Sequence, residues 1–389
     1  MSRRAVILVL DGVGAGAAHD AAVYGDPDSN TLGHLARAVG GFNLPALASY
    51  GLGNILPLEG IPRDSSADGA WGKMEPASAG KDSTTGHWEI AGVHLEKPFP
   101  TYPRGFPGEV VAEFSRLTGR GVLGNVVGSG TAVLDAYGAE HMQSGKWILY
   151  TSADSVFQVA AHEGVVPLRE LYDACAAARK MLVPPDDVSR VIARPFEGEP
   201  GAFRRTVNRR DYSIEPPAET LLDALAAGGI ARHGVGKVDD LFAMRSIESH
   251  HTASNADGID LIRSWVAGGE SGLLFANLVD FDQLYGHRND VAGFYNSLRE
   301  FDFALPSITS ALREEDLLFI TADHGNDPTT VSTDHAREAA PLLAIGPAVR
   351  PGDLGVRRTF SDLGATVGEW LGVSFRGRGE SFLPQLLRT

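Results

Sequence analysis

Residues 317–346 read LLFITADHGNDPTTVSTDHAREAAPLLAIG. An apolar run that is typical of a buried strand ends on Asp323 and His324. A second Asp–His pair, which ends at His335, follows within a short polar segment, and another apolar run closes the stretch. Carboxylates and imidazoles at the end of a buried strand supply the oxygen and nitrogen ligands of divalent metals. The stretch therefore predicts a metal site, and the alternative for either pair alone is a helix cap next to a buried histidine.

Two other apolar runs of the chain also end on carboxylates. Residues 5–10 read AVILVL and lead into Asp11, and residues 273–279 read LLFANLV and lead towards Asp282, with His287 shortly after. Such uninterrupted runs are typical of strands that are buried on both faces of a sheet. In an open α/β sheet, ligands bind outside the carboxyl ends of the strands. We therefore expect the three strand ends to meet in one composite site.

A dinucleotide-binding loop is the competing interpretation of the first strand. Residues 6–18 read VILVLDGVGAGAA, in which the glycines are evenly spaced, so the order G-x-G-x-x-G is missing. An acidic Asp11 ahead of the first glycine would also face a pyrophosphate unfavourably. We favour a metal-binding carboxylate at this position.

A candidate nucleophile lies in residues 80–92, which read GKDSTTGHWEIAG. Small hydroxyl residues, Ser83, Thr84 and Thr85, stand ahead of the Gly–His pair of this motif. If a helix begins here, Ser83 lies at its N-terminus, where backbone N–H groups and the helix dipole stabilise an incoming phosphate. The alternative is ordinary N-capping by Asp82 or Ser83. The neighbouring metal motifs favour the nucleophile.

The chain resembles the prokaryotic phosphopentomutases of the alkaline phosphatase superfamily along nearly its whole length. The metal motifs alone would indicate only the superfamily, whereas GHWEIAG, TSADSV and IARPFEGEPG favour the pentomutases. The segments that carry the resemblance are LVLDGVGAG, GDPDSNTLGHLA, GLGNI, GKDSTTGHWEIAG, YTSADSVFQVAAHE, VIARPFEGEPGAF, NRRDY, NLVDFDQLYGHR and ITADHGNDPTTVSTDH.

The resemblance implies an α/β fold. Its alkaline-phosphatase-like core would have a central, mostly parallel sheet flanked by helices, and a smaller α/β cap domain would be inserted into it. We expect the core to comprise residues 1–97 and 216–389 and the cap to comprise residues 98–215. Turn-rich stretches, EKPFPTYPRGFPGE and EPP, mark the two boundaries.

The same resemblance implies two Mn²⁺ ions per chain. One ion would be held by Asp282, His287 and His335, and the other by Asp11, Asp323, His324 and the nucleophile. The usual nucleophile of the family is the Thr directly after the Asp of GKD, and here Ser83 stands in its place. Both residues are alcohols, and the related cofactor-independent phosphoglycerate mutases use Ser there. Ser83 is therefore the predicted nucleophile and metal ligand, with Thr85 as the fallback.

The substrate contacts that the resemblance implies are Asp154, Arg194 and Arg205 in the cap and Lys237 in the core. The net charge of −15 argues against nucleic acid as a partner, so a protein that binds phosphate must gather cations locally. The densest cationic group of the sequence comprises Arg204, Arg205, Arg209 and Arg210.

The implied reaction interconverts α-D-ribose 1-phosphate, or 2-deoxyribose 1-phosphate, with the 5-phosphate. It would pass through a phosphoenzyme and a 1,5-bisphosphate and would be primed by a sugar bisphosphate such as glucose 1,6-bisphosphate. The alternatives are a phosphoglycerate mutase, which is expected to carry a longer insertion and NSEVGH, a metal-dependent phosphatase or sulfatase, and a non-catalytic metal-binding module.

Composition bears on the compartment and on possible partners. The chain of 389 residues suggests two or so domains, and no apolar run approaches the length of a membrane span. A single cysteine, Cys175, suits a reducing cytoplasm. We therefore expect a cytoplasmic enzyme of pentose phosphates, without membrane or nucleic acid partners, that is a monomer or a weak oligomer.

Overall fold

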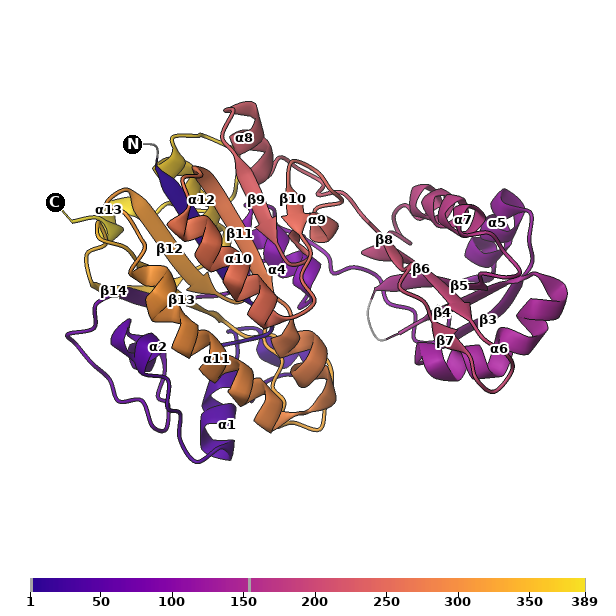
Figure 1. Ribbon diagram of the computed structural model, residues 1–389, viewed down its shortest axis with the longest axis horizontal. Helices are drawn as coiled ribbons and strands as arrows, with labels where there is room; N and C mark the ends of the chain where they lie inside the picture. Colours follow the sequence, from indigo (N-terminus) through magenta and orange to yellow (C-terminus); the bar gives the residue numbers. More distant parts are fainter. Residues whose placement is uncertain (1–2, 153–154, 389) are drawn as a thin grey trace. The chain divides into compact units, whose positions relative to one another are not determined.

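A computed structural model describes residues 3–152 and 155–388 of the chain (Figure 1). By the contacts within the chain, it divides into two compact units. The core unit comprises Met1–Lys97 and Pro216–Thr389, and the inserted unit comprises Pro98–Glu215.

The core unit contains an eight-stranded sheet with the order β10-β9-β11-β1-β12-β13-β2-β14. Neighbouring strands from β10 to β12 run parallel, and only β13 runs antiparallel to both of its neighbours, which confirms the mostly parallel sheet. The strands are β1 (Arg4–Leu10), β2 (Ala70–Met74), β9 (Arg232–Val235), β10 (Glu248–His250), β11 (Gly272–Leu278), β12 (Asp316–Thr321), β13 (Ala340–Ile345) and β14 (Gly352–Arg357).

Helices cover both faces of this sheet (Figure 1). Helices α10 and α11 pack on each other in front of the sheet, whereas α4 and α12, which also contact each other, lie behind it. The strands β1, β11, β12 and β13 are buried along their whole length, as their uninterrupted apolar runs predict. The helices are α1 (Thr31–Ala38), α2 (Pro45–Ser49), α3 (Leu52–Ile55), α4 (Ser83–Ile90), α8 (Leu221–Ala227), α9 (Val238–Leu241), α10 (Asn255–Ala267), α11 (Val291–Thr309), α12 (Ser361–Leu371) and α13 (Leu383–Leu386).

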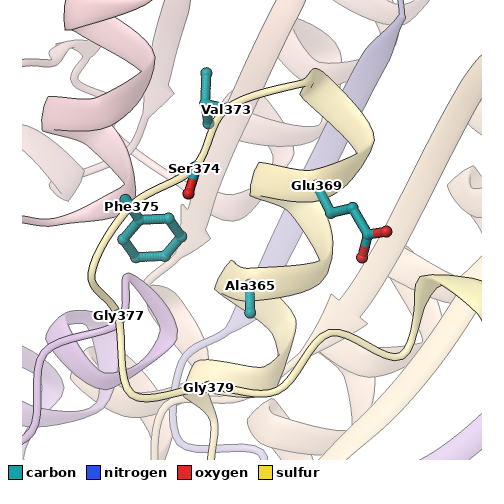
Figure 2. Close-up of a pocket in the computed structure, with 7 residues that line it drawn as sticks. All are labelled: Ala365, Glu369, Val373, Ser374, Phe375, Gly377 and Gly379. Carbon is teal, nitrogen blue, oxygen red and sulfur yellow. The ribbon is translucent and has the colours of Figure 1, made fainter.

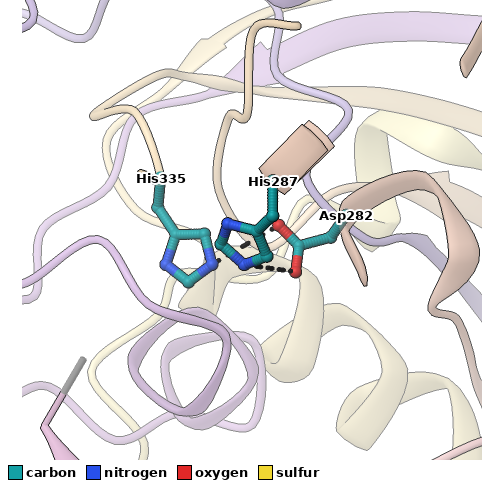
Figure 3. A group of neighbouring side chains, drawn as sticks. All are labelled: Asp282, His287 and His335. Atoms are coloured by element: carbon teal, nitrogen blue, oxygen red, sulfur yellow. Dashed lines mark ion pairs between the residues drawn. The ribbon is translucent and has the colours of Figure 1, made fainter. Parts of the chain in front are cut away.

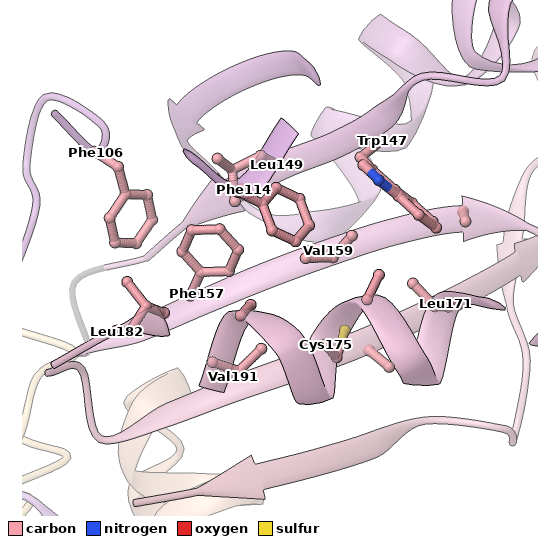
Figure 4. Close-up of a cluster of buried hydrophobic side chains, with 14 of the residues drawn as sticks. Phe106, Phe114, Trp147, Leu149, Phe157, Val159, Leu171, Cys175, Leu182 and Val191 are labelled. Atoms are coloured by element: carbon pink, nitrogen blue, oxygen red, sulfur yellow. The ribbon is translucent and has the colours of Figure 1, made fainter. Parts of the chain in front are cut away.

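The inserted unit is a small α/β unit, as the sequence predicts, with a six-stranded sheet of its own. The order is β3-β4-β5-β6-β7, and β8 also pairs with β6. Figure 4 shows the apolar cluster between its sheet and α7, in which Phe114, Trp147, Phe157 and Cys175 are fully buried. The elements are β3 (Val122–Val127), β4 (Trp147–Thr151), β5 (Val156–His162), β6 (Arg190–Glu197), β7 (Arg204–Arg205), β8 (Arg210–Ser213), α5 (Gly108–Thr118), α6 (Gly130–Ser144) and α7 (Leu168–Met181).

Two further features concern the surface and the helices of the described residues. A pocket of about 260 Å³ lies between α12 and the turn that follows it, lined by Ala365, Glu369, Phe375 and neighbours, and includes none of the predicted site residues (Figure 2). Among the residues that the structure describes, no helix is both long enough and apolar enough to cross a membrane.

Candidate active site

The predicted metal ligands lie at one edge of the core sheet. Strands β11, β1 and β12 are parallel neighbours, so the residues that follow them, including Asp11, Asp282 and Asp323, emerge at the same edge. Strand β13 runs antiparallel and begins at this edge, which brings His335 to the same place. The structure therefore brings together the three strand ends that the sequence singles out, together with the segment that precedes β13.

The first group of candidate ligands comprises Asp282, His287 and His335 (Figure 3). One ligand atom from each lies within 4.8 Å of the others. His287 Nε2 is 3.2 Å from Asp282 Oδ2, and His335 Nε2 is 3.4 Å from Asp282 Oδ1. The Nδ1 of His287 lies 2.7 Å from the carbonyl oxygen of Thr333, which only accepts, so Nδ1 carries the proton. The lone pair of Nε2 then faces the carboxylate, as in a metal-binding histidine.

A second group comprises Asp11, Asp282 and His324, again within 4.8 Å of one another. His324 Nε2 is 3.3 Å from Asp11 Oδ1 and 3.5 Å from Asp323 Oδ2. Its Nδ1 donates to the carbonyl oxygen of Gly325 at 3.1 Å, so Nε2 is the ring nitrogen that faces the carboxylates. Asp282 thus lies in both groups, whereas the sequence places it in one only. The two predicted sites are close enough to share a carboxylate.

The electrostatics of this edge call for cations. Burial alone would raise the pKa of Asp11, but Lys237 and His324 hold it below its usual value. Burial likewise opposes ionisation of Asp282, and its histidine neighbours lower its pKa well below the usual range. Burial would lower the pKa of His324, yet Asp323 and the other two carboxylates raise it to about 10. Three buried carboxylates therefore require nearby positive charge to balance them.

The donor set fits divalent metal ions. Asp323 Oδ2 and His335 Nε2 are buried and make no hydrogen bond. Buried polar atoms are normally paired, so unpaired ligand atoms of this kind are suited to coordinate an ion. Three carboxylates with imidazole nitrogens form a mixed oxygen and nitrogen set that transition metals such as Mn²⁺ accept. The individual ligand assignments remain predictions.

Ser83 lies next to the second group. Helix α4 begins at Ser83, as the sequence predicts, and Asp82 is its N-cap. Ser83 Oγ is 3.1 Å from His324 Nε2 and 3.5 Å from Asp11 Oδ1. Thr85 Oγ1, by contrast, donates to Asp82 Oδ2 at 2.6 Å and so takes part in the cap. This geometry favours Ser83 over Thr85 as the nucleophile.

Gly86 allows helix α4 to approach the edge of the core sheet where the candidate metal ligands lie. A Cβ at Gly86 would lie 2.1 Å from the carbonyl oxygen of Asp323, a distance that no side chain tolerates. Helix α4 therefore packs directly on the backbone at Asp323, after β12. This contact holds Ser83 near His324.

Two asparagines hold the carboxylates, and neither they nor a neighbouring histidine, His87, were recognised in the sequence. Asn326 Nδ2 donates to Asp282 Oδ1 at 2.7 Å, and Asn277 Nδ2 donates to Asp11 Oδ2 at 3.0 Å. His87 Nδ1 lies 3.2 Å from Asp323 Oδ2 without a hydrogen bond to it, and 2.9 Å from the carbonyl oxygen of Ser83, to which it donates. All three lie inside motifs of the sequence, but nothing in an unaligned chain shows which polar side chain of a motif points at a carboxylate. The two asparagines orient the ligands, as the neighbours of metal ligands commonly do.

The predicted substrate residues lie in both units. Lys237 Nζ in the core is 3.1 Å from Asp11 Oδ2. In the inserted unit, burial together with the positive charges of Arg209 and Arg205 lowers the pKa of Arg194 to about 10. Asp154 lies outside the described residues.

Most of the cationic group in the sequence is engaged locally. Arg209 forms an ion pair with Asp211, with Nη2 and Oδ2 2.6 Å apart, and Arg204 Nε lies 2.9 Å from Glu197 Oε1. The guanidinium of Arg205 lies against Gly130, at the first residue of α6. Arg194 lies outside this group, is half-buried, and donates from Nε to Gln158 Oε1 at 3.0 Å.

Comparisons with known proteins agree along the whole chain. The family model of the metalloenzyme superfamily matches residues 3–374. The phosphopentomutase of Desulfitobacterium hafniense is 52% identical, over 99% of this chain and 100% of that protein. The phosphopentomutase of Carboxydothermus hydrogenoformans is 53% identical over 98% of both chains, and that of Anaeromyxobacter sp. strain K is 53% identical over 100% of both.

A solved structure shares the fold. The PH0037 protein of Pyrococcus horikoshii superposes with a TM-score of 0.50 at 16% identity, covering 97% of this chain and 98% of that chain. At this identity the likeness concerns the fold alone. The conclusion rests on the sequence identities over the full length of the chains. The chain belongs to the phosphopentomutases, metal-dependent isomerases of the metalloenzyme superfamily.

Proposed function

We propose that this phosphopentomutase interconverts the 1-phosphate and 5-phosphate of α-D-ribose or 2-deoxyribose through a phosphorylated Ser83. The observation that carries the proposal is the Ser83 hydroxyl, which lies 3.1 Å from His324 Nε2 at the N-terminus of α4. A helix N-terminus presents free backbone N–H groups to the oxygens of a phosphoryl group.

The reaction proceeds in two balanced transfers. The phosphoryl group leaves Ser83 Oγ for the free hydroxyl of the sugar monophosphate, the proton of that hydroxyl passes to Ser83, and a 1,5-bisphosphate results. The other phosphoryl group of the bisphosphate then returns to Ser83 Oγ, and its former oxygen takes up the proton. A sugar bisphosphate such as glucose 1,6-bisphosphate would phosphorylate Ser83 at the start.

Two Mn²⁺ ions are proposed as the resident cofactor. Asp282, His287 and His335 would hold one, and Asp11, Asp323, His324 and Ser83 would hold the other. When bound, the ions lower the pKa of the Ser83 hydroxyl and neutralise charge on the transferring phosphoryl group. Asn326 and Asn277 keep two of the carboxylates in place by the hydrogen bonds described above.

The inserted unit, residues 98–215, is proposed as the cap that binds the sugar phosphate. Arg194 supports this role, because it is a half-buried guanidinium near the positive charges of Arg209 and Arg205, which Asp211 offsets in part, and a phosphate dianion would relieve the remaining repulsion. Arg205 and Asp154 are proposed to contact the substrate with it, and Lys237 is proposed to contact it from the core. Exclusion of water by a cap would protect the phosphoenzyme from hydrolysis.

A cytoplasmic location and a monomeric or weakly oligomeric state complete the proposal. The single cysteine supports the location, because the chain cannot form an internal disulfide.

One coupled assay tests the function. The metal-loaded protein, primed with glucose 1,6-bisphosphate, is given ribose 5-phosphate, and ribose 1-phosphate and inorganic phosphate are measured together. A mutase forms ribose 1-phosphate in large excess over phosphate. Release of phosphate without the isomer would indicate a phosphatase, and turnover of phosphoglycerate alone would indicate the other mutase.

Replacing Arg194 by methionine is expected to weaken the binding of the substrate phosphate by the cap. A hydrogen bond to a charged group contributes about 1.5–3 kcal/mol, so the KM for ribose 5-phosphate should rise about 10- to 100-fold. The ratio of phosphate released to isomer formed should also rise, because the acceptor no longer competes well with water.

Arg179 provides the matched control for this variant. It is also a half-buried arginine of the inserted unit, with its pKa lowered by burial to about 10, but it donates to the carbonyl oxygens of Leu182, at 2.8 Å, and Val188, at 2.5 Å. Arg179→Met should lower the melting temperature and leave the product ratio unchanged. Equal ratios in the two variants would remove Arg194 from the substrate site.

A further inference from the structure

The segment Pro76–Gly80, here called the strap, leads from β2 to the nucleophile helix α4. Its N–H groups face a buried carboxylate. Glu89 Oε1 accepts from Ala77 N at 2.8 Å, and Glu89 Oε2 accepts from Ser78 N at 2.7 Å. Glu89 is 1% exposed and lies on the last turn of α4. The helix that carries Ser83 therefore also carries the acceptor that holds the segment before it.

The carbonyl groups of the strap face a buried guanidinium. Arg337 Nη2 donates to Pro76 O at 3.0 Å, and Arg337 Nη1 donates to Ser78 O at 2.7 Å and to Gly80 O at 2.5 Å. Arg337 is 3% exposed, and its charge is balanced by Asp20, with Nη2 and Oδ2 2.9 Å apart. Only the planar guanidinium, with its several fixed donors, spans three carbonyls in this way.

The remaining N–H groups of the strap are bound as well. Ala79 N donates to Leu95 O at 2.8 Å, and Gly80 N donates to the hydroxyl oxygen of Tyr24 at 3.2 Å. The ring of Tyr24 also packs on the guanidinium of Arg337, 4.6 Å from Cζ to the ring centroid. Gly80 has φ of +120°, a value that side chains rarely adopt. The strap is thus held in one conformation from both sides.

The strap is also linked to the segment that follows His335, a predicted metal ligand. Arg337 comes two residues after His335 in the chain, and its backbone N donates to Asp26 Oδ2 at 2.9 Å. The same oxygen lies 3.0 Å from Nζ of Lys81, the residue after the strap. Arg337 therefore ties the segment before the nucleophile to the segment that follows a predicted metal ligand.

We propose that Arg337 and Glu89 are positioning residues. Through the strap, they fix Ser83 relative to the candidate metal ligands at the edge of the core sheet. Burying two opposite charges is costly, and apolar side chains would fill the same space at less cost. Their value lies in directional bonds to backbone groups, which set where α4 begins. The inference rests on the proposed role of Ser83 as nucleophile.

The test replaces Arg337 by methionine and by lysine in the full-length, metal-loaded protein. A displacement of the nucleophile by about 1 Å costs on the order of 100-fold in rate, so Arg337→Met should lower kcat about 100-fold. Arg337→Lys keeps the charge but not the fork of donors, and should lose about 10-fold. Bound metal and the KM for ribose 5-phosphate should stay within about twofold, because neither variant removes a ligand or a substrate contact.

Arg4 offers a matched control in the same unit. It is 2% exposed, its Nε lies 2.7 Å from Asp316 Oδ1, and it donates to Gly268 O at 3.4 Å. It lies at the start of β1, whereas the candidate metal ligands lie beyond the end of this strand. Arg4→Met and Arg4→Lys should lower the melting temperature but leave kcat per folded molecule unchanged. The two lysine variants keep the comparison decisive if a methionine variant does not fold.

The decisive readout is the single-turnover rate of Ser83 phosphorylation by saturating glucose 1,6-bisphosphate. We expect the rate to fall in both Arg337 variants and in Glu89→Gln, and to stay at the wild-type value in the Arg4 variants. Wild-type phosphorylation rates per folded Arg337 variant would overturn the positioning role. Phosphate on another residue in the wild-type protein would instead overturn the nucleophile, which is a separate result.

Discussion

Replacement of Ser83 by alanine is expected to abolish both mutase turnover and the phosphoenzyme. Without the hydroxyl no group at the N-terminus of α4 carries the phosphoryl group between the two oxygens of the sugar. Loss of the nucleophile in enzymes that form a covalent intermediate costs on the order of 10⁵-fold or more in kcat. The fold should survive, because the N-cap of α4 is Asp82 and the change removes a single atom.

Two variants control for this result. Ser83→Thr retains an alcohol, which is the usual residue of the family at this position, and should keep measurable turnover. Thr85→Val removes the hydrogen bond from Thr85 Oγ1 to the cap Asp82 and should cost about 1 kcal/mol of stability while the phosphoenzyme still forms. Substantial turnover by Ser83→Ala, together with an inactive Thr85→Val, would transfer the role to Thr85.

Removal of divalent metal by a strong chelator is expected to abolish activity completely. The carboxylates of Asp11, Asp282 and Asp323 would then face each other with only histidines and Lys237 as compensating charge. Mn²⁺ should restore the activity better than Ca²⁺, because Ca²⁺ prefers oxygen ligands alone and three of the candidate ligands are imidazoles. Activity and bound metal, measured side by side during titration, check the prediction.

The shared carboxylate makes the metal prediction sharper. Asp282 lies in both groups of candidate ligands, whereas His287 lies in one. Asp282→Asn should therefore lower the metal content more than His287→Ala does. Full activity after extensive dialysis against a strong chelator would contradict a metal-dependent mechanism.

Much of the core was predictable because its signals are local. The runs AVILVL and LLFANLV predict buried strands, and the structure has β1 and β11 there. The rule that ligands gather at the carboxyl ends of parallel strands then places Asp11, Asp282 and Asp323 together. The antiparallel direction of β13 has no such signal, since a fully buried apolar run reads the same in both directions.

Contacts between distant segments were not predictable from one sequence. Arg337 holds carbonyl groups more than 250 residues away, and no periodicity or motif spacing records such a bond. Arg205 and Arg209 could not be told from solvated surface charges, and Arg194 stands out only once its partial burial near other arginines is known. The sharing of Asp282 between two groups likewise depends on side-chain placement that strand ends alone do not define.

The most direct test of the account is the site of phosphorylation and its discharge. The metal-loaded protein is incubated with glucose 1,6-bisphosphate, fragmented, and the phosphate is located by mass spectrometry before and after addition of ribose 5-phosphate. We predict phosphate on Ser83 before the addition, its transfer to sugar afterwards, and little inorganic phosphate. Phosphate on Thr84 or Thr85, or a phosphorylated Ser83 that ribose 5-phosphate does not discharge, would contradict the account.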